Sequence, residues 1–276
     1  MKPTLLLLSF LILSCQDFSL KNDQSNKNLT SYVNTFVGTG GHGHTYPGAT
    51  LPFGMMQLSP DTRLDGWDGC SGYHYSDSHI YGFSHTHLSG TGVSDYGDVL
   101  LMPTNKINFN NGSDGKDGYR SSFLHENEEA SPGYYNVYLD DTNIEVSLSV
   151  SKRSGIHKYK FLKGSKQIVI LDLEHRDEVL DSKLLVENNQ LVSGHRFSKA
   201  WATDQRLFFD IEFSRPFTNV TFLEGKTDGK KVKAAFEFDS SESNILEVQV
   251  GISAVDNEGS RKNRITELKD KFLDEL

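Results

Sequence analysis

Residues 38–98 constrain the fold most, because glycine and proline occur in them too densely for a long helix. These 61 residues hold 13 of the 24 glycines in the chain. Glycine adopts positive φ angles and allows close backbone approach, whereas Pro47, Pro52 and Pro60 interrupt a helix. The stretch is therefore predicted to form packed loops and short strands.

The same residues concentrate side chains that suit a neutral polyol ligand. Six of the ten histidines and six aspartates lie here, against a single Arg63 and without lysine or glutamate. Such polar groups hydrogen-bond hydroxyls, and an aromatic ring such as Trp67 stacks on the apolar face of a sugar. The composition indicates a sugar site.

Residues 36–77 and 80–103, including the segment GWDGCSGYHY, strongly resemble the opening of the family 92 glycoside hydrolases, which are bacterial exo-acting α-mannosidases. The similarity continues more weakly to the end of the chain. It implies an all-β fold, a large antiparallel β-sandwich of the galactose-mutarotase-like supersandwich type. In the family an (α/α)₆ barrel follows and supplies the catalytic acid, the base and most ligands of an essential calcium ion. No part of this sequence corresponds to that barrel.

The resemblance thus implies the pocket-forming N-terminal domain of a calcium-dependent, inverting exo-α-mannosidase that acts on α-mannosides of N-glycans or mannans, truncated before its barrel. The expected partners are mannose-containing glycans and the missing barrel. No catalytic residue and no metal ligand is expected within this chain. Candidate pocket or interface residues are Trp67, Asp68, Asp61, Arg63, His42, His44, His85, His87 and Asp95, and Trp201 and Asp204 could reach the same pocket.

These residues also allow structural interpretations. Trp67 could be a core residue, the histidines could pack the loops through hydrogen bonds, and the aspartates at 61, 65 and 68 could close Asx turns. Cys70 is interpreted as a partly buried small residue in a tight turn rather than a nucleophile. The whole chain could also be a lipid-anchored carbohydrate-binding module without catalysis.

The spacing of the histidines raises a second chemical hypothesis. His42 and His44, and likewise His85 and His87, form H-x-H pairs. On strands, each pair would place both imidazoles on one face, an arrangement suited to zinc or iron. Neither a glutamate a few residues after the first pair nor an H-E-x-x-H motif supports this hypothesis.

The N-terminus has the pattern of an exported lipoprotein. Residues 1–15 combine a basic start at Lys2 with an apolar core, and ILSC at residues 12–15 fits a lipobox in which Cys15 is lipidated. Residues 16–30 are predicted to be a polar tether. We expect attachment to the outer membrane through lipid alone, facing the periplasm or the cell exterior. A soluble secreted protein with an incidental cysteine is the alternative.

Charge and cysteine content limit the other partners. The formal net charge is −9 and the isoelectric point is about 5.6, which argues against binding to nucleic acid or anionic lipid. If Cys15 is lipidated, Cys70 is left alone and no disulfide is expected.

Apolar or alternating runs bounded by turn residues recur from residue 134 onward, every ten to fifteen residues. This spacing favours an antiparallel sandwich over a parallel sheet. The domain is predicted to span residues 31–255. The predicted strands are 134–139, 144–150, 156–161, 167–173, 190–197, 207–213, 232–238 and 245–252.

Two segments interrupt the strand pattern. Residues 108–118 are a polar turn cluster, interpreted as a solvated hairpin loop because the spacing of an EF-hand cation site is missing. Residues 256–276 are predicted to be helical, with Asp256 as N-cap and an apolar stripe of Ile265, Leu268, Phe272 and Leu276. This helix is interpreted as the start of a linker to the missing barrel.

Overall fold

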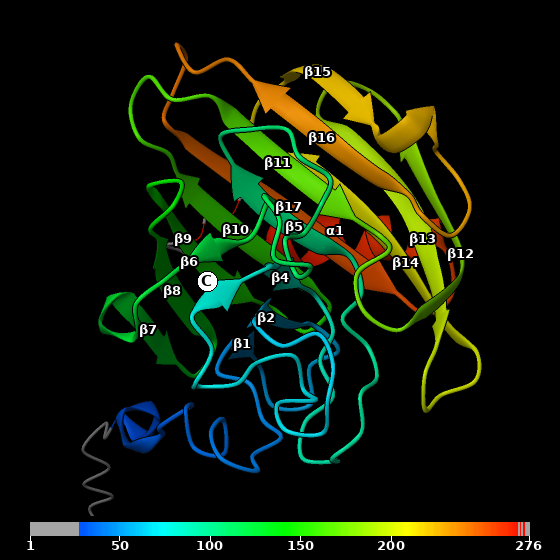
Figure 1. The fold of residues 1–276 in the computed structure, drawn as a ribbon. Helices are drawn as coiled ribbons and strands as arrows, with labels where there is room; N and C mark the ends of the chain where they lie inside the picture. The colour runs from blue at the N-terminus through cyan, green and yellow to red at the C-terminus, as the bar shows by residue number, and fades with distance from the viewer. Residues whose placement is uncertain (1–27, 270, 272, 274–276) are drawn as a thin grey trace, which may run out of the picture.

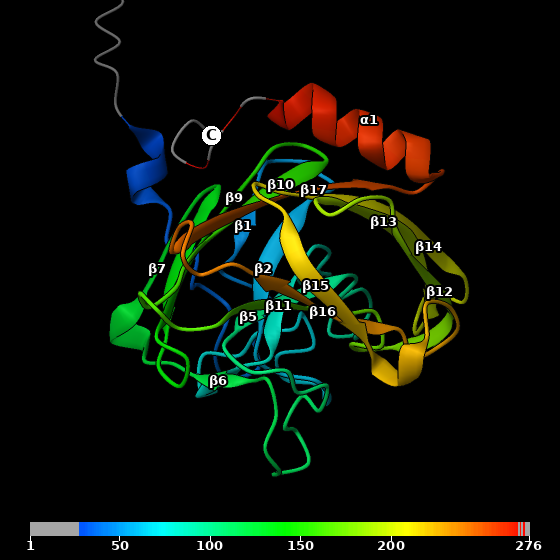
Figure 2. The same cartoon turned by 90° about the horizontal axis from the view of Figure 1, so that it is seen from above.

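The computed structural model describes residues 28–269, 271 and 273. Two large antiparallel sheets face each other, and one helix covers the outer face of the larger sheet (Figures 1 and 2). The predicted signal sequence, Cys15 and most of the predicted tether lie outside the described residues. Among the described residues, no helix has the length and apolar character needed to cross a membrane.

The sheets join strands that are far apart in the sequence. The seven-stranded sheet has the order β1 (Ala49–Thr50), β2 (Gln57–Asp61), β4 (Gly82–Ser84), β5 (Leu100–Thr104), β11 (Gln167–Asp172), β16 (Lys233–Phe238) and β15 (Phe217–Phe222). The eight-stranded sheet has the order β12 (Glu178–Val186), β13 (Leu191–Lys199), β14 (Gln205–Phe213), β17 (Ile245–Ser253), β10 (Ser154–Lys160), β9 (Ile144–Val150), β8 (Tyr134–Leu139) and β7 (Glu128–Ser131).

Smaller elements complete the fold. Strands β3 (His79–Ile80) and β6 (Ser121–Ser122) form a separate pair. In the part of the chain that the structure describes, the short 3₁₀ helices are η1 (Leu29–Tyr32), η2 (His125–Asn127) and η3 (Leu223–Gly225), and the α-helix is α1 (Asn257–Leu268). The last residues of the predicted tether therefore already belong to η1.

Strand β17 shows why the chain forms this sandwich. Its even-numbered residues Leu246, Val248, Val250 and Ile252 are fully buried between the sheets. Successive side chains of a strand alternate between its faces, so the intervening polar residues turn to the outer face. Burial of each such aliphatic side chain contributes roughly 1.5–3 kcal/mol. The antiparallel β-sandwich predicted from the sequence is confirmed.

Helix α1 lies on the outer face of the eight-stranded sheet (Figure 2). Asp256 is its N-cap as predicted, and its side chain accepts a hydrogen bond of 2.6 Å from the amide of Gly259. The buried Leu268 packs with Ile156 and Leu273. The helix thereby attaches to the outside of the sandwich through a small apolar cluster.

The predicted length of this helix was wrong. It ends at Leu268, and Gln249 of β17 donates from Nε2 to the carbonyls of Leu268 and Lys271, both at 3.1 Å. These bonds satisfy carbonyls that lack helical partners at a C-terminus, which lets the chain leave the helix. The predicted apolar stripe is also incomplete, because Ile265 is 45% exposed. Phe272 and Leu276 lie outside the described residues.

The loop at residues 108–118 is solvated as predicted, but it is not a hairpin. It connects β5 to β6, which belong to different sheets. Asn110 donates a hydrogen bond of 3.1 Å from Nδ2 to the carboxylate of Asp114, and its Oδ1 accepts one of 3.1 Å from the amide of Gly112. Lys106 forms an ion pair with Asp117. Its polar side chains therefore hold the loop in shape themselves.

Candidate functional site

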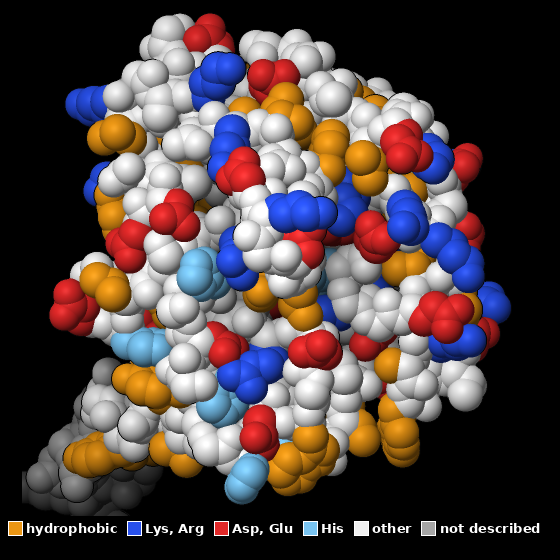
Figure 3. Space-filling view, viewed as in Figure 1, with side chains coloured by type: hydrophobic (Ala, Val, Ile, Leu, Met, Phe, Trp, Pro, Cys, Tyr) orange, Lys and Arg blue, Asp and Glu red, His pale blue; other side chains and the backbone are white. Residues whose placement is uncertain are grey.

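The glycine-rich residues 38–98 place their loops at one end of the sandwich, beneath β1 and β2 in Figure 1. We call residues 38–48, 62–78 and 85–98 the loop cluster. Figure 3 shows histidine and apolar side chains gathered at this lower end of the molecule. Residues 38–98 as a whole fold into loops and short strands, as their glycine and proline content predicts.

An exposed aromatic face forms the surface of the loop cluster. Trp67 is 57% exposed, which excludes the core alternative. The ring of His44 meets the indole edge-on at 4.3 Å, and the ring of His42 lies 5.6 Å away. His42 Nδ1 is 2.8 Å from Asp68 Oδ1, and this hydrogen bond lowers the pKa of Asp68. The surface thus joins a stacking ring to a polar pair that can bind hydroxyls.

Asp61 lies in β2 beneath this surface and is fully buried. Its carboxylate accepts a 2.5 Å hydrogen bond from Ser84, and its oxygens lie 3.4 Å from His87 Nε2, 3.4 Å from His175 Nε2 and 3.6 Å from Arg176 Nη1. Burial by itself raises the pKa of Asp61, but the charges of His175 and His87 outweigh it and hold the pKa well below its usual range. Asp61 is therefore an ionised anchor.

The contacts of His87 fix the orientation of its ring. Its Nδ1 donates to the carbonyl of Gln57 at 2.8 Å, since a carbonyl can only accept. Its Nε2 lies 3.2 Å from Ser84 Oγ and 3.4 Å from Asp61 Oδ1. His87 thus lies between the Gln57 carbonyl and the Asp61 carboxylate.

A second buried ion pair joins the loop cluster to β13. Arg196 is fully buried and pairs with Asp98. Its Nη2 also donates to the carbonyls of His175, at 2.8 Å, and Arg176, at 2.5 Å. Gln205 donates to the other oxygen of Asp98 at 2.7 Å. This network links three distant parts of the sequence under the loops.

His85 takes part in a third buried network. Its Nδ1 donates to the carbonyl of Val99 at 2.6 Å, and its Nε2 lies 2.9 Å from Nε2 of His157, whose Nδ1 is 2.9 Å from the hydroxyl of Tyr159. Burial lowers the pKa of His85 to about 4 and that of His157 well below its usual range. Both rings are therefore neutral near pH 7.

The strand assumption behind the H-x-H hypothesis was wrong. His42 and His44 lie in a turn region, and His85 and His87 follow the end of β4. The rings of His85 and His87 instead bind separate partners. Among the described residues, no group of three or more histidine, cysteine, aspartate or glutamate side chains could hold a metal ion.

Arg63 is tied to Asp77 rather than to the exposed face. Its Nε and Nη2 contact the two carboxylate oxygens at 3.1 Å and 2.5 Å.

Cys70 is 2% exposed, and burial raises the pKa of its thiol. That environment matches the structural interpretation of Cys70, because a nucleophilic cysteine needs a stabilised thiolate.

Asp95 brings a later loop to the cluster. It is 4% exposed, and its Oδ2 accepts a hydrogen bond of 3.1 Å from the amide of Ala202. The neighbouring Trp201 is 75% exposed, so a second aromatic side chain belongs to this end of the molecule. Asp204 pairs with Arg206 at 3.1 Å.

Seven of the nine predicted pocket residues therefore separate into two sets. Trp67, His42, His44 and Asp68 form the exposed face, whereas Asp61, His85 and His87 are fully or almost fully buried and support it. Sequence reasoning missed the partners His175 and Arg176. The sequence feature that indicates them is the charged run EHRD at residues 174–177, which directly follows an apolar strand.

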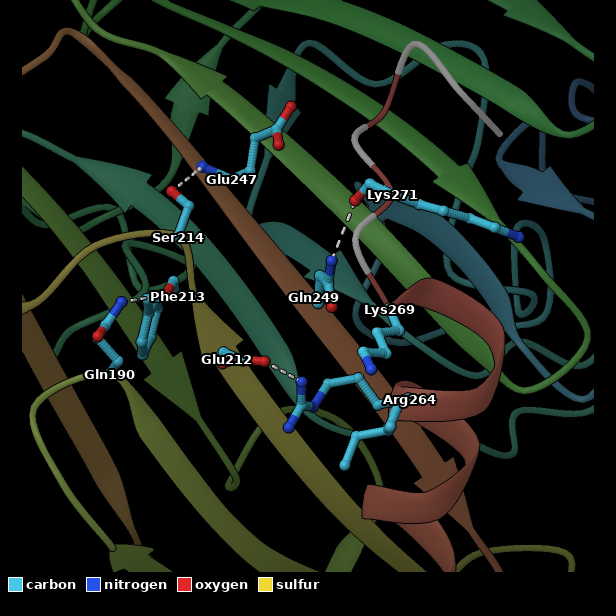
Figure 4. Close-up of a pocket in the computed structure, with 10 residues that line it drawn as sticks. Gln190, Glu212, Phe213, Ser214, Glu247, Gln249, Arg264, Lys269 and Lys271 are labelled. Carbon is cyan, nitrogen blue, oxygen red and sulfur yellow. Dashed lines mark hydrogen bonds and ion pairs between the residues drawn. The ribbon is translucent and has the colours of Figure 1, made fainter.

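A separate pocket of about 570 Å³ lies between α1, β14 and β17 (Figure 4). Arg264 in its wall is already paired with Glu212, and Gln249 binds the carbonyl of Lys271. Among the described residues, its lining includes no candidate of the loop cluster. We therefore place the candidate site at the exposed face around Trp67.

Residues 32–253 match the family model of the glycosyl hydrolase family 92 N-terminal domain. The chain belongs to this family. Its fold also matches that of a family 92 α-mannosidase from Bacteroides thetaiotaomicron solved in complex with mannoimidazole, with 34% identity and a TM-score of 0.84. That match covers 90% of this chain and 35% of the other protein.

Further relatives agree with this family 92 assignment. A family 92 inverting mannosidase from Bacteroides thetaiotaomicron is 26% identical, with a TM-score of 0.75, over 88% of this chain and 34% of that protein. A protein of Arthroderma benhamiae described as an uncharacterized secreted glycosidase is 29% identical over 185 residues, which cover 62% of this chain and 22% of that protein. The chain thus spans about a third of these solved structures and a fifth of this relative.

Proposed function

We propose that this chain forms the sugar-facing wall of a calcium-dependent, inverting exo-α-mannosidase whose catalytic acid and base lie in a helical barrel outside the given sequence. The family assignment and the similarity to a mannosidase bound to mannoimidazole support the substrate class. The similarity to a protein described as an inverting mannosidase supports the stereochemistry. The observation that carries the proposal is the exposed face of Trp67, bordered by the His42–Asp68 pair.

The loop cluster suits this task because its exposed groups rest on rigid supports. The indole of Trp67 stacks on the apolar face of a mannose ring, while His42 and Asp68 bind hydroxyl groups at its edge. Buried ion pairs below, such as Arg196 with Asp98, hold the loops in one arrangement. A wall that is already ordered loses little conformational entropy when the sugar binds.

We place the calcium ion of the proposed enzyme in the barrel, together with the catalytic carboxyl groups. Calcium takes six to eight oxygen ligands, and no cluster of three or more acidic or histidine side chains suited to a metal occurs among the described residues. Inversion further requires two carboxyl groups about 6.5–9.5 Å apart with a water molecule between them. We assign these groups and the calcium ligands to the barrel.

We also propose that the protein is exported and anchored through a lipid on Cys15, with the sandwich on the periplasmic or outer side of the membrane. The lipobox in the sequence and the description of a relative as secreted support this location.

A hybrid enzyme tests the proposed function. In it, this chain replaces the corresponding N-terminal domain of the 34% identical Bacteroides thetaiotaomicron α-mannosidase. The hybrid should release mannose from α-linked mannobiose in the presence of calcium, whereas the 276-residue chain alone should release none. Circular dichroism verifies folding of both proteins. Mannose released by the chain alone would contradict the assignment of the catalytic groups to the barrel. A folded hybrid without activity would contradict the proposal and favour a binding module.

A further inference from the structure

Arg176 lies beneath the exposed face and joins two of its loops. Its Nη2 donates to the carbonyl of Cys70 and to the hydroxyl of Ser94, both at 2.7 Å. Cys70 belongs to the turn that begins at Trp67, since its amide bonds to the Trp67 carbonyl at 3.3 Å. A single guanidinium nitrogen therefore holds the Trp67 turn and the Ser94 loop together.

The Ser94 loop in turn packs against the indole. A Cβ atom added at Gly92 would lie 3.1 Å from Nε1 of Trp67 and 3.3 Å from Cε1 of His44. Gly92, two residues before Ser94, thus lies beside the rings of Trp67 and His44, with no room for a side chain between. Movement of this loop relative to the Trp67 turn would change the contact between the two rings.

The backbone around Arg176 adopts an unusual conformation. Arg176 and Asp177 have φ angles of 52° and 49°, in the left-handed region that non-glycine residues rarely enter. Such residues persist when their surroundings enforce them, and they cluster at functional sites. Here Arg196 binds the carbonyl of Arg176 and Ser94 donates to the Asp177 carboxylate at 3.2 Å. The conformation directs Arg176 into the loop cluster.

Glycines leave room for the Arg176 side chain. A Cβ at Gly72 would lie 2.6 Å from Arg176 Nη1, and a Cβ at Gly97 would lie 2.9 Å from its Cδ. Both glycines also have positive φ angles. Asp61 balances the guanidinium charge from 3.6 Å. The fit is therefore specific for an arginine at this position.

We propose that Arg176 is a positioning residue for Trp67. Its guanidinium fixes the Trp67 turn against the loop of Gly92 and Ser94, and so sets the orientation of the indole beside His44. That this orientation favours sugar binding rests on the proposed function. That Arg176 restrains the position of Trp67 does not depend on the proposed function.

Tryptophan fluorescence tests this role directly. The chain has two tryptophans, so Trp201→Phe leaves Trp67 as the only reporter. In this background, Arg176→Ala should raise the acrylamide quenching constant of Trp67 roughly twofold, because local loop opening exposes the ring. The matched control is Arg264→Ala, which removes a buried arginine of α1 that pairs with Asp210. It should lower the melting temperature without changing Trp67 quenching.

A milder variant guards against misfolding. Ser94→Ala removes only the hydroxyl that Arg176 holds, and it should raise the quenching constant in the same direction by a smaller factor. Added guanidinium at low concentration should reverse the Arg176→Ala change but leave Arg264→Ala unaffected. Unchanged Trp67 quenching in folded Arg176→Ala or Ser94→Ala would overturn the inference. These fluorescence measurements are made without sugar. Their outcome would therefore stay the same if the proposed mannosidase function were wrong.

Discussion

Replacement of Arg196 by methionine should lower the free energy of unfolding by about 3–5 kcal/mol, because it leaves the buried carboxylate of Asp98 without its charge partner. The backbone carbonyls of His175 and Arg176 lose donors in the same change. Urea denaturation of the full chain, followed by circular dichroism, measures the difference.

The control for this prediction is Arg206→Met on the adjacent strand β14. Arg206 pairs with Asp204 at the surface, so its loss should cost less than about 1 kcal/mol. The double variant Arg196→Met with Asp98→Asn should recover part of the lost stability, since no full charge is then left unpaired. Equal effects of the two single arginine variants would refute the role given to the buried pair.

Stability should also fall on the order of 3 kcal/mol between about pH 6.5 and pH 4 through His85 alone. The folded-state pKa of His85 is about 4, below the ordinary value of 6.5. As pH falls through this window, the unfolded chain binds a proton at this site that the folded chain does not, so unfolding becomes more favourable. Below about pH 4 both states bind the proton, and this contribution stops changing.

The buried carboxylate of Asp61 contributes in a different range. Its folded pKa lies well below the ordinary 3.8, so the stability it provides is present above that value and is lost at lower pH. Urea denaturation at several pH values therefore separates the two groups. The His85→Gln variant should show a smaller stability loss between pH 6.5 and 4 than the parent chain. An unchanged slope in that variant would show that His85 does not cause it.

The sequence predicted the central strands well because burial on one face produces regular alternation. The predicted ranges for β8 and β9 match the structure in full. From residue 134 onward, the strands that were missed are β12 and β15, which lie at the edges of their sheets. An edge strand packs against fewer neighbours, and Asp181 and Lys183 interrupt the apolar pattern of β12. A bulge near Val179 further breaks its periodicity.

The candidate site was predictable only in part. The exposed face is formed by residues close in sequence, and the composition of residues 38–98 indicated its chemistry. The buried supports join distant positions, since Arg196 pairs with Asp98 across a separation of 98 residues. Such a pair depends on how two sheets fold together, which local patterns do not specify. Burial also decided which candidates support the face and which form it.

The most direct test of the account is the kcat/KM of the hybrid enzyme carrying Trp67→Ala. Loss of the stacking surface should lower kcat/KM for α-linked mannobiose roughly tenfold or more, about 1.4 kcal/mol of transition-state stabilisation. Tyr138→Ala, which removes an exposed aromatic ring on β8, should leave kcat/KM unchanged. A folded Trp67→Ala hybrid with the kcat/KM of its parent would contradict the claim that this face binds the sugar.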